Sequence, residues 1–363
     1  RLIAEARTLR ALYYFNLVRF FGDVPLILDL KTVEDSKGPR DSKELIYDQI
    51  IEDLTFAEEH LPLRSEYSAS DEGRINKGAA KILFGKVYLT KGDFQKAKDK
   101  LAEVVEHESE YGFGLHKDYH ANWLRDTEAG IEAVLYIEYK EPPFQHNGEM
   151  ALAGPKYSIP GSLGISALNE ADIPTQELYD QFDNRDLRKK TNFKTEFAHL
   201  KTGEILKSSI PLSGKFWVEG LETGDRCDVN MHIIRYADAI LMYAEALNEV
   251  GESTKALAML NRIRERAFGD DSGNFKPMSK DEFRTAILNE RRLEFPHEGH
   301  RWFDLVRTGT FIQRMKEHSA YEAKVAEANK TEIAQNIKEH MILMPIPQSE
   351  IDLNPNLVQN AGY

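Results

Sequence analysis

The sequence predicts a mainly α-helical protein, a scaffold of helical hairpins that carries an irregular, loop-rich lobe with short β-strands. Three observations predict this class. Apolar residues recur at three- and four-residue steps over long stretches on both sides of residues 140–230. One helical hairpin recurs 159 positions later in the chain. Residues 140–230 themselves hold 8 of the 23 glycines and 6 of the 14 prolines, and they lack long periodic stretches.

Two helices open the chain. The first covers residues 2–21 and stops at Gly22, and the second covers residues 42–60, where Asp41 and Glu44 have capping-box spacing. In the first helix, apolar residues recur every three or four positions, so the spacing predicts that this face is buried. The face consists of Leu2, Ala6, Leu9, Tyr13, Leu17 and Phe20.

Residues 76–107 predict a helical hairpin, two apolar-faced helices separated at Gly92. A shift of 159 positions lays Gly92 on Gly251, so we expect a second antiparallel hairpin over residues 233–267. These features are typical of tetratricopeptide repeats, although any αα-hairpin also favours a glycine turn and small residues where its helices cross. The small residues at the expected crossings are Gly85 and Ala244.

The middle of the chain predicts loops and short strands. Alternating or β-branched stretches predict strands near residues 134–139, 191–197 and 205–210, with a turn over residues 201–204. Long loops in a compact protein are usually functional, so we expect the ligand site here.

Helices resume after this lobe. Besides the second hairpin, a helix begins at Ser279 with Glu282 in capping-box spacing and stops at Pro296. A short helix over residues 302–307 ends by Gly309, and alternating charge predicts a solvated helix over residues 315–340.

Composition narrows the function classes. Lys and Arg total 47 against 60 Asp and Glu, a net charge of −13, and such a surface repels the phosphate backbone, so we do not expect a nucleic-acid partner. The single Cys227 cannot form a disulfide within the chain or a cysteine-rich metal site. No stretch approaches the roughly 18 apolar residues that span a bilayer. The chain begins at Arg1, so any export signal or lipid-anchoring cysteine would lie upstream of it.

Motifs for catalysis or metal binding are missing from the sequence. It contains no Gly-x-Ser-x-Gly elbow, Walker loop or dinucleotide fingerprint. His116 and His120 lie four apart, but their segment lacks an apolar helical period and no third ligand is indicated. His297 and His300 lie three apart in a segment broken by Pro and Gly, where a packing role is the better interpretation. We therefore expect a protein without enzymatic activity, metal or cofactor.

Aromatic residues outside the predicted helices indicate a sugar site. Pyranose rings stack their C–H faces on aromatic side chains, while sugar hydroxyls need planar polar partners. Trp217 and Trp123 present the largest ring faces, Tyr157 lies in a proline-flanked loop, and Arg185 and Asp183 are the expected hydroxyl partners. For each ring, burial in the core as a loop anchor is the competing interpretation.

Four stretches together resemble the SusD/RagB family of outer-membrane nutrient-binding lipoproteins. They occur in the family's order and cover nearly the whole chain. The stretches are residues 5–15 with Phe21-Gly22-Asp23-Val24-Pro25-Leu26; Arg235-Tyr236-Ala237-Asp238 with residues 242–248; residues 290–295 with Glu298-Gly299-His300-Arg301-Trp302-Phe303-Asp304; and the tail with Pro345-Ile346-Pro347, Asn354-Pro355-Asn356 and Gly362-Tyr363.

The resemblance implies a tetratricopeptide-like helical scaffold tethered by lipid to the outward face of the outer membrane. It also implies that the protein captures oligosaccharides or similar nutrients and delivers them to a SusC-like TonB-dependent transporter. The Arg and Glu side chains of residues 290–301 can then pair across helix ends, and Trp302 is expected in the core. The family's N-terminal cysteine and first helices have no counterpart in this chain.

We therefore expect a non-enzymatic surface glycan-binding protein. Residues 1–110 and 231–363 form the predicted scaffold, and residues 111–230 form the ligand-binding lobe inserted in it. The competing hypothesis is an intracellular tetratricopeptide adaptor that binds protein segments in a helical groove. An upstream signal peptide ending in a lipidated cysteine would favour the first hypothesis, and an initiator methionine shortly before Arg1 the second. A glycoside hydrolase would need two carboxylates about 5–9.5 Å apart across a cleft.

Overall fold

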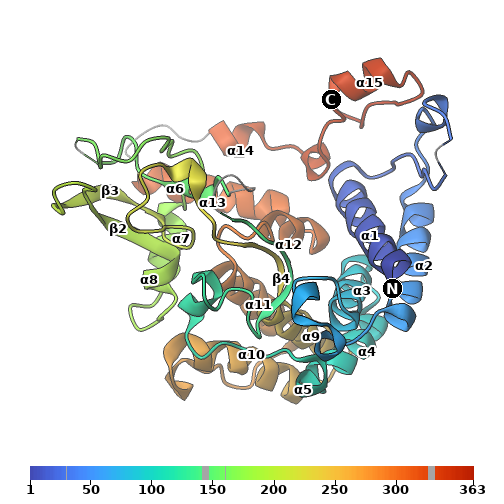
Figure 1. The fold of residues 1–363 in the computed structure, drawn as a ribbon, viewed down its shortest axis with the longest axis horizontal. Helices are drawn as coiled ribbons and strands as arrows, with labels where there is room; N and C mark the ends of the chain where they lie inside the picture. Colours follow the sequence, from blue (N-terminus) through green and yellow to red (C-terminus); the bar gives the residue numbers. More distant parts are fainter. Residues whose placement is uncertain (30, 141–146, 160, 326–331) are drawn as a thin grey trace. The chain divides into compact units, whose positions relative to one another are not determined.

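The computed structural model describes residues 1–29, 31–140, 147–159, 161–325 and 332–363 (Figure 1). Helices dominate and strands are few and short, which confirms the predicted fold class. The chain divides into two compact units. The first consists of Arg1–Ser70, Arg74–Asp93 and Trp302–Tyr363, and the second of Asp71–Gly73 and Phe94–Arg301. The predicted scaffold and lobe group the chain differently and stay a prediction.

The first unit is helical. In it α1 (Leu2–Phe21) packs against α2 (Lys43–His60), and α2 packs against α3 (Lys77–Lys91). The side chain of Ser42, one residue after the predicted cap, accepts a hydrogen bond from the Leu45 amide at the start of α2. The unit also holds most of α12 (Arg301–Arg307), with α13 (Phe311–Val325), α14 (Glu332–Asn336) and α15 (Gln348–Leu353).

The helix predicted over residues 2–21 forms, but its predicted buried face is wrong. The residues from Leu2 to Leu17 that define the predicted stripe are exposed, and the opposite side is buried. Apolar residues occur at helical spacing on both sides, so periodicity alone could not choose between them. Small residues on the buried side allow the neighbouring helices to approach closely. That side includes Ala4, Thr8, Ala11, Phe15 and Val18.

In the second unit, α9 (Tyr236–Glu249) and α10 (Ser253–Phe268) pack against each other as the predicted hairpin, with Gly251 in the turn. The predicted break at Gly92 is also confirmed, because α3 ends before it and α4 (Phe94–Val105) begins after it. Both glycines have positive φ, 78° and 90°, and an added Cβ would meet no atom within 4 Å, so the backbone conformation alone requires glycine. Both α4 and α11 (Lys280–Glu294) pack on α9.

Short elements complete the second unit. Two antiparallel pairs of strands form, β1 (Ala133–Ile137) with β4 (Met231–Arg235) and β2 (Phe193–Ala198) with β3 (Ile205–Ser213). Three strands match the predicted ones within three residues at each end, but the prediction misses β4, because the helical pattern of α9 was extended back over it. The short helices are α5 (Glu108–Tyr111), α6 (Glu149–Ala153), α7 (Gln176–Gln181) and α8 (Lys189–Asn192).

The helix ends near the C-terminus follow their local signals. Ser279 and Glu282 form the predicted capping box at the start of α11. The chain leaves α12 through Gly309, whose φ is 67°. The solvated helix expected over residues 315–340 corresponds to α13 and α14, and residues 326–331 of that prediction lie outside the described residues.

Candidate functional site

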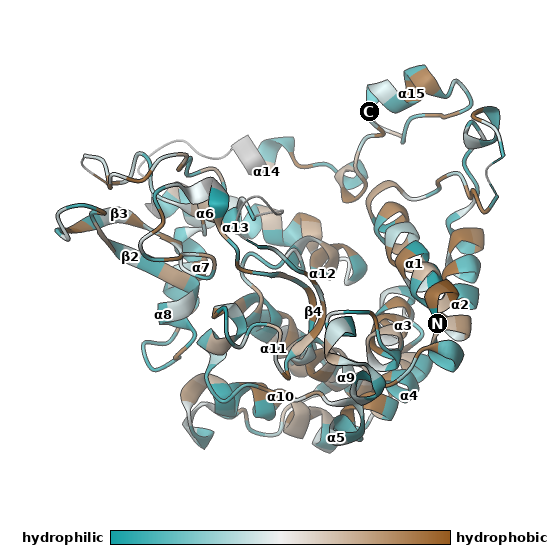
Figure 2. Ribbon diagram, viewed as in Figure 1, coloured by the Kyte–Doolittle hydropathy of each residue, from teal (hydrophilic) through white to brown (hydrophobic). Residues whose placement is uncertain are grey.

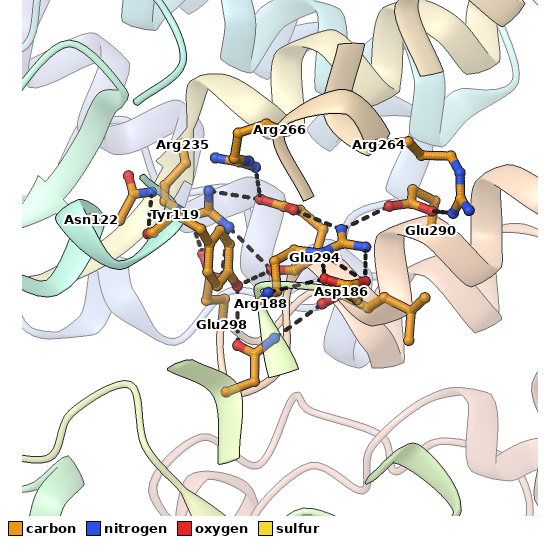
Figure 3. Close-up of polar contacts among 12 residues, drawn as sticks. Tyr119, Asn122, Asp186, Arg188, Arg235, Arg264, Arg266, Glu290, Glu294 and Glu298 are labelled. Carbon is orange, nitrogen blue, oxygen red and sulfur yellow. Dashed lines mark hydrogen bonds and ion pairs between the residues drawn. The ribbon is translucent and has the colours of Figure 1, made fainter. Parts of the chain in front are cut away.

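A buried ion network ties the irregular segments of the second unit to its helices (Figure 3). Arg235, at the end of β4, lies 2.5 Å from Glu132 and 3.1 Å from Glu294. Arg188, in the segment before α8, donates to the same Glu294 at 3.0 Å. The central ion network consists of Glu132, Asp186, Arg188, Lys215, Arg235, Arg264, Arg266, Glu290, Glu294 and Glu298.

The network balances its charges. Five cationic side chains face five carboxylates, so each buried charge has a counter-charge. Burial alone raises the pKa of Glu294, but the arginines around it, with Arg266 and Arg235 foremost, outweigh burial and hold this pKa at about 2. Burial lowers the pKa of Lys215 to about 8, even though its Nζ lies 2.5 Å from Glu298. Glu294 is therefore ionised at neutral pH.

The network positions loops. Nine of its ten side chains are at most 4% exposed, and the Arg264 side chain is 14% exposed. Tyr119 donates its hydroxyl proton to the Glu294 carbonyl at 2.6 Å, which fixes the segment before β1 to the end of α11. Lys215 and Arg188 anchor the segments on the two sides of the β2–β3 pair. Buried ion pairs and hydrogen bonds therefore hold the surface loops of this unit in place.

Two apolar clusters lie beneath these loops, and the half-buried Trp217 packs against both. The first apolar cluster consists of Tyr119, Trp123, Met150, Phe216, Cys227 and Val229. The second apolar cluster consists of Ile159, Leu163, Leu168, Phe197 and Leu212.

Trp123 is enclosed in the first apolar cluster and is only 4% exposed. Its ring meets the Tyr119 ring edge-on with 4.8 Å between centroids, and the Lys215 Nζ lies 4.5 Å from its centroid. A ring enclosed in this way has no open face for a sugar. The geometry favours the interpretation that Trp123 anchors its loop, and its role in glycan binding stays a prediction.

Trp217 is half-buried. Its ring contacts Phe197 edge-on at 4.7 Å between centroids. The Lys194 Nζ, 2.7 Å from Glu219, lies 5.8 Å from the Trp217 ring centroid. The indole Nε1 is buried and has no hydrogen-bond acceptor among the described residues. A buried donor without an acceptor is unfavourable.

Tyr157 is the most exposed of the predicted aromatic residues, at 76%. Its loop is fixed by Glu170, whose Oε2 accepts hydrogen bonds from the amides of Lys156, Tyr157 and Ser158 at 2.7, 2.5 and 3.0 Å. Burial raises the pKa of Glu170, but the three amides outweigh burial and lower it below its ordinary value. A charged carboxylate thus holds the loop while the Tyr157 ring extends from it.

The Tyr157 loop and Trp217 meet at the second apolar cluster. Ile159 of this loop belongs to that cluster, against which Trp217 packs. The Ser158 carbonyl accepts a hydrogen bond from the Ser209 amide of β3 at 2.9 Å. The structure therefore brings Trp217 and the loop that carries Tyr157 to one cluster.

Asp183 and Arg185 lie in a different part of the unit. The Arg185 Nη2 donates to Asp183 at 2.7 Å, and this hydrogen bond lowers the pKa of Asp183 to about 2. Both side chains are exposed, and the Arg185 guanidinium lies 5.5 Å from the ring centroid of Phe268, the last residue of α10. Their predicted contact with sugar hydroxyls stays a prediction.

Sequence reasoning misses the residues that support the loops. Glu170 lies 13 residues from Tyr157 in a stretch without periodicity, and no local signal points to its three amide contacts. The arginines and glutamates of residues 290–301 are expected to pair, but Glu132 and Arg188 have no sequence signal. Trp302, which was expected in the core, is only half-buried and packs edge-on against Phe311 at 4.5 Å between centroids.

The described residues contain neither a cluster of metal ligands nor a helix that could span a membrane. Among these residues, His, Cys, Asp and Glu side chains form no group of three that could hold a metal ion. His116 and His120 therefore belong to no such group. In the same part of the chain, no helix has both the length and the apolar composition to cross a bilayer.

Two family models match the two ends of the chain. The model described as "SusD family" matches residues 211–363. The model described as "Starch-binding associating with outer membrane" matches residues 1–89.

Similar proteins match nearly the entire chain. SusD-like protein P2 of Formosa agariphila is 30% identical over 99% of this chain and 74% of its own length. Starch-binding protein SusD of Bacteroides thetaiotaomicron is 31% identical over 99% of this chain and 72% of its own length. The solved structure of a laminarin-binding SusD-like protein has a TM-score of 0.77 and 28% identity, over 100% of this chain and 79% of that chain.

Proposed function

The chain belongs to the SusD family, and we propose that it captures oligosaccharides without transforming them. The resemblance noted in the sequence is thereby confirmed. The observation that carries the proposal is the match over nearly the entire chain to a starch-binding protein and to a laminarin-binding protein. Starch and laminarin are both glucose polymers, so glucans are the first ligand class to test. The comparisons do not favour an intracellular adaptor.

Tyr157 and Trp217 are the proposed stacking residues. The exposed Tyr157 ring extends from a loop that Glu170 already fixes, so binding orders little new backbone. Trp217 is half-buried and packs against the second apolar cluster, to which Ile159 of the Tyr157 loop also belongs. Both residues contact or adjoin the second apolar cluster, which supports a common site.

The first test is the variant Tyr157→Ala, assayed by calorimetry against maltooligosaccharides and laminarin oligosaccharides. Removing a stacking ring typically weakens binding by about 2 kcal/mol, roughly thirtyfold. The melting temperature should stay unchanged, because the ring is exposed. Tyr363→Ala, an exposed tyrosine in the first unit, is the control and should bind normally. Normal binding by Tyr157→Ala would remove this residue from the proposed site.

Trp217→Phe tests the second proposed stacking residue. Phenylalanine retains an aromatic face but a smaller one, so glycan affinity should fall, and normal binding would remove Trp217 from the proposed site. Asp183→Ala and Arg185→Ala test the predicted hydroxyl partners in the same assay. An unchanged affinity in either variant excludes that side chain from the proposed site.

Release of reducing ends from the same glucans would contradict a non-enzymatic role.

We also propose that the full-length protein is lipid-anchored on the outward face of the outer membrane and passes glycan to a SusC-like TonB-dependent transporter. Family membership and the description of the second family model support this proposal. The test is purification of the full-length protein, expressed from its own locus, in mild detergent. Co-purification with a transporter barrel is expected, and isolation of the protein alone over a range of salt concentrations would contradict the partnership.

A further inference from the structure

One segment next to the proposed glycan site has a strained backbone. In this strained segment, residues 167–172, Ala167 and Glu170 have positive φ angles of 59° and 56°, which residues other than glycine rarely adopt. The third such residue of the described chain, His297, also has a φ of 59°, and its Nδ1 lies 3.2 Å from the carboxylate of Asp172 in the same segment. Conformations of this kind persist only where surrounding contacts enforce them, and they concentrate at ligand-binding sites.

Contacts with two other elements hold the strained segment. The amides of Ala171 and Asp172 both donate to the carbonyl of Leu152 in α6, at 2.8 and 3.0 Å. The side chain of His297, in the turn after α11, is 6% exposed, and its hydrogen bond to Asp172 lowers the pKa of that carboxyl below its ordinary value. Helix α6 and the turn after α11 therefore enforce the strained backbone.

Glu170 extends from this segment to the Tyr157 loop. Its Oε2 accepts from the amides of Lys156 and Tyr157, and these two amides have no other acceptor among the described residues. Ser158 is held twice, because its amide also donates to Glu170 and its carbonyl accepts from the Ser209 amide of β3. Beyond Ser158 the loop packs on the second apolar cluster, to which the brown, hydrophobic residues of the β2–β3 pair in Figure 2 contribute. The backbone at Tyr157 therefore depends on Glu170.

We propose that Glu170 is a positioning residue for glycan binding, which holds Tyr157 ready to stack on a sugar without contacting the sugar itself. This proposal rests on the proposed function of Tyr157. A loop that is ordered before its ligand arrives loses less conformational entropy on binding, so it binds more tightly than a mobile loop. The lowered pKa of Glu170 keeps its carboxylate ionised at neutral pH, and an ionised acceptor binds amides more strongly than a neutral one.

The test is a double-mutant cycle of Glu170→Ala and Tyr157→Ala, assayed by calorimetry against maltooligosaccharides and laminarin oligosaccharides. Alanine has a Cβ, as glutamate does, so the backbone strain at this position is retained and the variant reports on the lost hydrogen bonds. Glu170→Gln keeps an acceptor oxygen without the charge. Glu103→Ala on α4, which removes a partly exposed carboxylate 3.1 Å from Lys100, is the matched control and should bind normally.

Glu170→Ala should weaken binding about tenfold when Tyr157 is present, and Glu170→Gln should weaken it less. In the Tyr157→Ala background this loss should vanish, because Glu170 acts through Tyr157. Normal binding by Glu170→Ala would overturn the proposal. An equal loss in both backgrounds would indicate direct contact between Glu170 and the sugar and would also overturn it. Normal binding by Tyr157→Ala itself would refute the proposed function of Tyr157, so the two failures are distinguishable.

Hydrogen–deuterium exchange measures the loop without a ligand. The amides of Lys156, Tyr157 and Ser158 should exchange at least tenfold faster in Glu170→Ala than in wild type, because they lose their acceptor. The same amides should exchange at the wild-type rate in Glu103→Ala. Equal rates in Glu170→Ala and wild type would overturn the proposal, even if neither glucan binds. If Glu170→Ala does not fold, Glu170→Gln takes its place in both measurements.

Discussion

Replacing Glu294 by glutamine tests whether the central ion network stabilises the second unit. Glutamine preserves the shape of the side chain but removes its negative charge, which leaves three buried guanidiniums with one carboxylate fewer. Glu294 is fully buried and accepts from Arg188 at 3.0 Å, Arg235 at 3.1 Å and Arg266 at 2.5 Å.

The expected loss of stability can be obtained in two ways. Breaking a buried ion pair from one side costs about 3–5 kcal/mol, because the remaining charge stays desolvated. A pKa lowered from 4.5 to about 2 corresponds to about 3 kcal/mol at neutral pH. The second unit has about 210 residues. With about 2.1 cal/mol/K of unfolding entropy per residue, 3–5 kcal/mol lowers its Tm by roughly 7–11 °C.

Differential scanning calorimetry at pH 7 measures this shift. The matched control is Glu196→Gln, which removes an exposed carboxylate 3.2 Å from Lys207 in the same unit. An exposed pair contributes at most about 1 kcal/mol, so the control should melt within about 2 °C of wild type. If Glu294→Gln also melts within 2 °C of wild type, the network does not stabilise the unit and the reasoning fails.

The same variant predicts a pH dependence. Because the pKa of Glu294 is lower in the folded state than in the unfolded chain, its stabilising contribution is present above about pH 4.5 and is lost as the pH falls toward 2. The difference in Tm between wild type and Glu294→Gln should therefore shrink over that range. A difference that stays constant down to the acid limit of folding would contradict the lowered pKa.

Two further predictions concern buried residues near the first apolar cluster. Burial raises the pKa of Glu128 to about 7. The protonated Glu128 side chain therefore contributes to the stability of the folded state below about pH 4.5, and this contribution is lost as the pH rises through 7. Glu128→Gln keeps an acceptor for the Asn230 amide. The variant should melt several degrees above wild type at pH 8 and at the same temperature as wild type at pH 4.5. Equal melting temperatures at pH 8 would refute this prediction. Trp123→Ala should lower stability by about 3–5 kcal/mol, because it opens a cavity under the loops, and an unchanged Tm would show that the ring is not an anchor.

Elements defined by neighbouring residues were predictable from the sequence. The helix breaks at Gly92 and Gly251, and the capping box of Ser279 and Glu282, depend on backbone and side-chain contacts within a few positions. The β2–β3 pair with its turn is also local. The family, too, was recognisable, because its motifs are contiguous in the chain.

Predictions about burial were less successful, since burial depends on which segments meet. For α1, apolar spacing selected the exposed stripe, because a helix with two apolar faces gives no local reason to prefer either. Trp123 and Trp217 looked equivalent as aromatic residues in loops. The structure encloses Trp123, whose ring lies against Tyr119 and Lys215, and leaves Trp217 half-buried.

The sequence by itself determined the helical class, the helix breaks at Gly92 and Gly251 and the family, because these depend on periodicity and on contiguous motifs. Only the tertiary structure decided how the loops are held. Glu294 pairs with residues 59 and 106 positions away, Arg235 and Arg188, and Glu170 holds the Tyr157 loop through backbone amides, which carry no side-chain signal. A buried charge is stable only where its counter-charges converge, and that convergence exists only in the folded chain.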